Sequence, residues 1–200
     1  MIRIFVPLVT VCLFASMSFA QYSVPDSISD RIKSNAPQTE KISQLRDYAD
    51  ELLYSSTKKA RFFIDSAFRM ASRHNEKKLF HELYNNKGNY YFFSRKFDSA
   101  LTAYKKYLEY AVENDLPKTE QKAYSNIALI YYKKGISDSA IYYGLKSLEL
   151  AKNFGDSATL AKTYSDLGAA YLEKNNYVKA LENLSKSEKY EDPGNHFEMT

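Results

Sequence analysis

Cysteine is nearly absent from this chain, and its absence limits the class of protein. The single cysteine is Cys12. It lies in a leading segment that we expect to be removed, so the remaining chain has no disulfide framework and cannot be a disulfide-stapled miniprotein. Val9-Thr10-Val11 precedes Cys12 and does not resemble the small-residue box of bacterial lipoproteins, which disfavours a lipid anchor. About 180 residues remain after this segment, enough to bury a sizeable hydrophobic core.

Long apolar runs are missing after residue 20. The one apolar run, residues 4–17, follows Arg3 and precedes Ser18-Phe19-Ala20, a small-x-small cleavage site. This order is typical of a secretory signal peptide, residues 1–20, cleaved after Ala20. The run is shorter than the about 18 residues that a membrane span needs, which favours cleavage over a retained anchor. We therefore expect an exported chain, periplasmic or secreted, with no membrane span after cleavage.

No block of like charges stands out. The chain has 28 basic and 24 acidic residues, for a formal charge of +4. The two signs are interspersed, as on solvated helix faces, so we expect no nucleic-acid partner.

Signatures of chemistry are missing as well. His74, His81 and His196 do not have the spacing of metal ligands. The sequence contains neither a glycine-rich phosphate loop nor Gly-x-Ser-x-Gly. Acidic neighbours such as Asp47 and Asp50 are interpreted as ordinary solvated surface. The sequence therefore predicts no enzyme activity, no cofactor and no metal site.

What the chain does contain is a repeat with a period of 40 residues. Tyrosines, small residues and alanines coincide in three consecutive copies. The coinciding sets are Tyr84, Tyr124 and Tyr164; Gly88, Ala128 and Gly168; Tyr91, Tyr131 and Tyr171; Ala100, Ala140 and Ala180. A weaker copy precedes them, with Tyr48 under Gly88 and Ala60 under Ala100. The predicted repeats are 41–80, 81–120, 121–160 and 161–200.

Each copy is interpreted as a helix pair. Tyr84, Gly88 and Tyr91 lie at i, i+4 and i+7, on one helix face, and Ala100 and Tyr104 lie on the facing stripe of the next helix. Small residues let the two backbones approach, and aromatic rings fill the space around the crossing. The predicted pairs are 40–54 with 57–74, 76–93 with 97–113, 117–134 with 137–153, and 157–174 with 177–190.

Residues outside the helices also carry predictions. Residues 21–40 are expected to form a short helix that caps the first repeat, ended by Asn35-Ala36-Pro37. Gly135 and Asn175-Asn176 are expected to form the turns within the third and fourth pairs.

The stretch that carries the clearest family resemblance is residues 164–184, YSDLGAAYLEKNNYVKALENL. Its Tyr-x-x-Leu-Gly-x-x-Tyr and Ala-x-x-x-Leu spacing resembles a tetratricopeptide repeat, with Tyr where the family usually has Trp. The resemblance implies an all-α fold, a right-handed superhelical solenoid of about four antiparallel helix pairs that stack into one core. The long period resembles the tetratricopeptide arrays of bacterial sensor proteins.

The resemblance also implies a binding surface. In the family, the first helix of each pair lines a concave groove that holds a peptide or a partner helix. Residues opposite the Tyr-Gly-Tyr stripe should face this groove, where Asn and Lys can bind a peptide backbone or carboxylate and aromatic rings can anchor a partner. The predicted partner-binding residues are Asn85, Asn89, Phe92, Lys122, Asn126, Leu129, Tyr132, Lys162, Ser165 and Asp166.

A five-residue carboxylate clamp, known from chaperone-binding members, is matched only in part. Asn89, Asn126 and Lys162 agree with it. Asn85 stands where the clamp has Lys, and Asp166 stands where it has Arg, which would repel a carboxylate. We therefore interpret this face as a polar groove surface.

Two functions remain. The first is a protein–protein interaction module that binds a partner peptide or helix in the groove, without catalysis. The alternative is the sensory region of a larger bacterial signalling or transcription-regulating protein whose output domain lies beyond Thr200. Self-association through the open C-terminal end is a further expectation.

Overall fold

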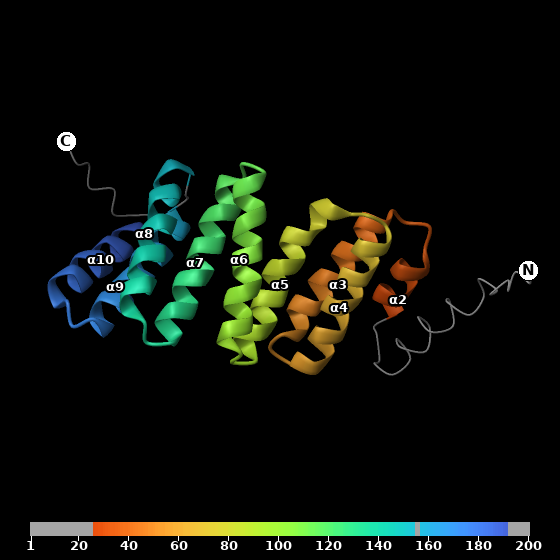
Figure 1. The fold of residues 1–200 in the computed structure, drawn as a ribbon, viewed down its shortest axis with the longest axis horizontal. Coiled ribbons are helices and arrows are strands. Elements are labelled where there is room, and N and C mark those ends of the chain that lie inside the picture. The colour runs from red at the N-terminus through yellow and green to blue at the C-terminus, as the bar shows by residue number, and fades with distance from the viewer. Residues whose placement is uncertain (1–25, 155–156, 192–200) are drawn as a thin grey trace, which may run out of the picture. The chain divides into compact units, whose positions relative to one another are not determined.

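The computed structural model describes residues 26–154 and 157–191, and every regular element in these ranges is a helix (Figure 1). The predicted signal peptide, residues 1–20, lies outside the described residues. None of the described helices is both long and apolar enough to cross a membrane. The chain divides into two compact units, Met1–Lys77 and Lys78–Thr200.

The first unit contains helices α2 (Asp26–Lys33), α3 (Gln38–Leu52) and α4 (Thr57–Arg73). Helix α3 packs on α4, and α2 contacts α3. The buried side chains of this pair include Ile42 and Leu45 on α3 and Phe63 and Ile64 on α4. The short leading helix predicted within residues 21–40 is therefore present as α2 and contacts α3, while its capping role stays a prediction.

The second unit contains three helix pairs. They are α5 (Phe80–Phe93) with α6 (Phe97–Glu113), α7 (Pro117–Lys133) with α8 (Ser137–Phe154), and α9 (Ser157–Glu173) with α10 (Tyr177–Glu191). Each helix packs on the next one along the chain. The start of α5 differs from the prediction, because residues 77–79 form a tighter 3-10 turn, η1 (Lys77–Leu79).

The turns repeat as closely as the helices do. Each described turn between α4 and α10, unlike the turn between α3 and α4, contains one residue with a φ between 51° and 70°: Asn75, Arg95, Asp115, Gly135 and Asn175. The next residue donates its backbone N–H to the carbonyl five positions back, as Ile136 does to Tyr131 at 2.9 Å. This closure is the Schellman motif, and its left-handed position suits Gly and Asn. Gly135 and Asn175 were predicted at these turns, whereas Arg95 occupies the same conformation with a side chain that disfavours it.

The small residues predicted at the helix crossings are confirmed, but the side chain that packs against each of them differs from pair to pair. A Cβ added to Gly88 would lie 2.3 Å from Cε1 of Tyr104, and one added to Gly168 would lie 2.7 Å from Cγ of Leu184. In the α7–α8 pair the glycine lies on the second helix instead of the first. Ala128 of α7 is aligned with Gly88, and Gly144 of α8 is aligned with Tyr104. Leu167 from the following pair approaches Gly144, with its Cδ2 2.8 Å from where a Cβ would be.

Neighbouring pairs are joined by apolar clusters and by a recurring ion pair. Ile127 and Ile130 of α7 pack with Ala100 and Tyr104 of α6. At the rim, Lys134 pairs with Asp98 at 2.5 Å, and Lys174 pairs with Asp138 at the equivalent position of the next junction. Both aspartates are highly exposed, so each ion pair contributes about 1 kcal/mol at most.

Candidate functional site

The first helices of the three pairs in the second unit line one groove of about 310 Å³. We call it the polar groove. Its lining residues are Asn85 and Asn89 from α5, Gln121, Lys122, Ser125 and Asn126 from α7, and Thr159, Lys162 and Thr163 from α9. Every one of them carries an amide, hydroxyl or ammonium group.

The polar groove brings together half of the predicted partner-binding residues. They are Asn85, Asn89, Lys122, Asn126 and Lys162. These residues come from three different repeats, and the groove therefore exists only because the repeats stack in register. Their role in binding a partner stays a prediction.

Two hydrogen bonds orient the asparagines of the groove. Asn126 Nδ2 on α7 donates to Asn85 Oδ1 on α5 at 3.0 Å. The hydroxyl of Tyr104, from α6, donates to Asn89 Oδ1 at 2.8 Å. A carboxamide has two N–H donors and a carbonyl acceptor, so each of these side chains keeps further hydrogen-bonding capacity for a ligand. Because the side chains are already held, binding costs less conformational entropy.

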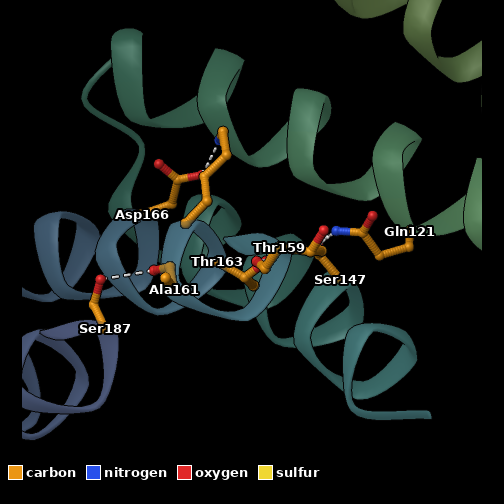
Figure 2. Close-up of polar contacts among 8 residues, drawn as sticks. Gln121, Ser147, Thr159, Ala161, Thr163, Asp166 and Ser187 are labelled. Carbon is orange, nitrogen blue, oxygen red and sulfur yellow. Dashed lines mark hydrogen bonds and ion pairs between the residues drawn. The ribbon is translucent and has the colours of Figure 1, made fainter. Parts of the chain in front are cut away.

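The floor of the groove contains residues that the sequence analysis missed. Gln121 is buried, and its Nε2 donates to Ser147 Oγ of α8 at 2.9 Å (Figure 2). The hydroxyl of Thr163 donates to the carbonyl of Thr159 at 2.8 Å. A matching contact occurs one repeat later, where Ser187 Oγ donates to the carbonyl of Ala161. The recurrence of serine at these two aligned positions is a signal in the sequence that could have identified this polar contact.

The two lysines of the groove differ in their partners. Lys162 Nζ lies 2.6 Å from Asp166 Oδ2, one turn further along α9 (Figure 2). Lys122 is exposed and has no ion-pair partner within residues 26–154 and 157–191. The electrostatic attraction for an anionic group is therefore strongest near Lys122, and Asp166 opposes it at the α9 end.

Three further predicted residues, Leu129, Tyr132 and Asp166, line a second and smaller hollow of about 50 Å³. We call it the apolar pocket. Its other lining residues are Ala128, Ala140, Gly144, Leu167, Ala169 and Ala170. These side chains are small or apolar, so the pocket suits a small apolar group.

The structure places the last two predicted residues away from both hollows. Phe92 packs against the apolar cluster around Tyr104 and Ile127, and its ring centroid lies 6.2 Å from that of Phe97. Ser165 is half-buried on α9 and lines neither hollow.

Titratable groups with shifted pKa values lie outside the polar groove. Burial is the first cause that raises the pKa of Tyr107, Tyr124, Tyr143 and Tyr164 above the ordinary value of 10.0. None of the four lines the groove. Across residues 26–154 and 157–191, no group of three or more His, Cys, Asp or Glu side chains could hold a metal ion.

Comparison with known proteins bears on the fold. The family model described as tetratricopeptide repeat matches residues 119–189. The structure is similar to BtubC (BKLC) from P. vanneervenii, with a TM-score of 0.73 and 19% identity, over 88% of this chain and 73% of that one. No curated protein sequence matches the chain.

A second solved structure is similar in fold. It is a Signal Transduction ATPase with Numerous Domains (STAND) protein with a tetratricopeptide repeat sensor, from Pyrococcus horikoshii. The TM-score is 0.72 with 21% identity, over 80% of this chain but only 25% of that protein. Residues 119–189 therefore match the tetratricopeptide repeat family, and the described helices have the all-α repeat fold of the solved tetratricopeptide structures, as predicted.

Proposed function

We propose that the chain is a protein-interaction module that holds an extended segment of a partner protein in the polar groove. Tetratricopeptide repeats form interaction or sensor modules. The observation that carries the finer proposal is the uniform chemistry of the groove, where amides, hydroxyls and ammonium groups from α5, α7 and α9 face one space.

The lining favours an extended partner over a helical one. An extended chain presents an unpaired N–H or C=O at almost every residue, and amide and hydroxyl side chains can pair with either. A helix satisfies its own backbone groups and would need an apolar wall for its apolar face. The polar groove offers no such wall, and the apolar pocket is large enough only for a small side chain.

Lys122 makes the groove favour a negatively charged partner segment. The ammonium group is exposed on the groove and has no ion-pair partner among the described residues, so a carboxylate placed beside it replaces no existing interaction. An acidic side chain in the bound segment is therefore favoured at the α7 part of the groove. Lys162 attracts an acidic side chain less strongly than Lys122 does, because Asp166 already neutralises its charge.

The test is selection of random peptides displayed on phage, using the purified full chain as bait. Binding of the best selected peptide is then measured by calorimetry to the parent, to Lys122→Ala and to Lys105→Ala. Lys105 is an exposed lysine on α6, outside the groove, and serves as the matched control. We expect Lys122→Ala to weaken binding about tenfold. Equal binding to all three proteins would refute the groove as the binding site.

A sensor function is the second candidate, supported by the fold similarity to the STAND protein with a tetratricopeptide repeat sensor. In that case the bound segment would be a signal passed to an output domain. Export is a further proposal, supported by the signal-peptide pattern of residues 1–20. Cell fractionation with N-terminal sequencing tests it, because processing after Ala20 would leave Gln21 as the first residue.

A further inference from the structure

Helix α10 presents an apolar face that the described residues leave largely open, although Leu184 within it also packs against Gly168 of α9. Tyr177, Leu181, Leu184 and Glu188 lie at i, i+4, i+7 and i+11, which places them on one stripe of the helix. We call it the α10 stripe. Leu181 is 68% exposed and Tyr177 66%. Ala180 and Ser187, on a neighbouring side of α10, are buried in the second unit.

The repeat register shows that the α10 stripe is built as a contact surface. The residues aligned with Leu181 and Glu188 one repeat earlier are Ile141 and Leu148 on α8. Ile141 is only 9% exposed, and both side chains belong to the cluster that contains Leu167 of α9. The same register position is therefore covered on α8 and uncovered on α10.

The α10 stripe does not suit another helix of the α7 or α9 type. At the two preceding junctions, Asp98 and Asp138 each form an ion pair with a lysine at the end of the following helix. The aligned residue on α10 is Val178, which cannot form such a pair. Glu188 replaces a buried leucine, Leu148. A following helix of the same type would find no aspartate and would bury the Glu188 carboxylate against apolar side chains, which is costly.

A second copy of the same stripe is complementary to it. When two α10 helices lie antiparallel around a two-fold axis midway between Glu182 and Asn183, Leu181 faces Leu184 of the partner subunit. In the same alignment Tyr177 faces Glu188 of the partner subunit, because both pairs share that midpoint. The Tyr177 hydroxyl donates to Asn175 Oδ1 within its own chain at 3.1 Å, and at the dimer contact it can donate to the Glu188 carboxylate of the partner subunit instead. The contact is isologous, so both leucine pairs lie at its centre and both tyrosine–glutamate pairs at its ends.

We propose that the chain forms a symmetric dimer through the α10 stripe. One helix face is at the small end of specific interfaces, so the dimer should form and dissociate with concentration. The polar groove is lined by α5, α7 and α9 and contains no residue of α10, and dimerisation is therefore independent of the proposed peptide binding.

The first test is sedimentation equilibrium of the purified full chain over a wide concentration range. We expect a monomer–dimer equilibrium in the parent and a monomer in Leu181→Glu, which places a carboxylate at both central contacts. The loss should exceed about a hundredfold in the dissociation constant. The matched control is Leu145→Glu on α8, whose side chain is 47% exposed and lies outside the stripe, and it should dimerise like the parent.

A charge exchange tests the antiparallel alignment itself. Glu188→Lys should weaken the dimer, and adding Tyr177→Glu should restore it, because the new glutamate would face the new lysine. Both positions are exposed, so both variants should fold. A parent that stays monomeric at every concentration overturns the proposal. So does a dimer formed only after removal of residues 192–200, which would identify that segment as the occupant of the stripe.

Discussion

The helix pairs α5–α6 and α7–α8 share one backbone plan but fill their crossings in different ways. In α5–α6, Gly88 leaves space for the ring of Tyr104, so the pair fills its crossing from within. In α7–α8, Gly144 leaves space that Leu167 of the next pair occupies. A large side chain therefore occupies the space beside the glycine in both pairs, but it comes from the same pair in one case and from the next pair in the other. One pair completes itself, and the other depends on its neighbour.

We expect the largest effect on stability from truncating Leu167, the side chain that α9 contributes to the α7–α8 crossing. Leu167→Ala deletes a fully buried side chain against Gly144 and should lower the free energy of unfolding by about 3 kcal/mol. Adding Gly144→Ala should recover part of the loss, because the new methyl group enters the vacated space. Chemical denaturation of the single and double variants measures the coupling. Strictly additive effects would show that the two positions do not share volume.

Gly88→Ala should have the next largest effect. Its added Cβ would lie 2.3 Å from Tyr104, whose hydroxyl is held by Asn89, so the ring cannot move away freely. We expect a loss of about 2 kcal/mol, after allowing for the better helix propensity of alanine. Gly168→Ala is the control, because it meets the partly exposed Leu184 and should cost less. The interpretation fails if both substitutions cost the same.

Substitutions in the turns of the two pairs should change stability by a smaller amount, and one of them should raise it. Arg95 has a φ of 56° and Gly135, at the aligned position, a φ of 70°. Arg95→Gly should stabilise the protein by about 0.5–1 kcal/mol, because glycine adopts this conformation without a steric penalty. Gly135→Arg should destabilise it by a similar amount. Thermal unfolding of both variants measures the difference, and the same sign for both would contradict the assignment.

The smallest effect should appear only in alkaline solution. Burial raises the pKa of Tyr107 on α6 above 10.0, and a hydrogen bond with Thr119 opposes this. The folded state thus keeps the proton longer than the unfolded state, so the stability contributed by Tyr107 is complete below pH 10 and is lost as the pH rises through the folded pKa. Tyr107→Phe should therefore make stability fall less steeply above about pH 10, which chemical denaturation at a series of pH values measures.

Much of the fold could be predicted because the repeat marks its own boundaries. Turn-forming residues located the turns at Gly135 and Asn175, and apart from the start of α5 the helix bounds agree with the predicted ones within two residues. The reversed crossing of α7–α8 was not predicted, because one aligned column cannot show that Leu167 of another repeat fills the space beside Gly144.

The candidate site was predicted less completely. Helical spacing correctly gathers Asn85, Lys122 and Lys162 at one groove, because residues on one face of stacked helices lie side by side. It misses Thr159 and Thr163, which line the groove at positions outside the predicted stripe. It also misplaces Phe92 relative to the groove, since spacing alone does not show that the ring packs toward Phe97.

The ion pairs Lys134–Asp98 and Lys174–Asp138 have a consequence for how such a chain can evolve. Loss of residues 121–160 by recombination would bring Lys174 opposite Asp98, and duplication of the same 40 residues would create a third identical pair. Leu167 would likewise replace Ile127 at the retained junction, with a side chain of the same size. Recombination can therefore lengthen or shorten the array by one 40-residue repeat at a time. Each such change adds or removes one helix that lines the groove and keeps the same contacts between neighbouring repeats.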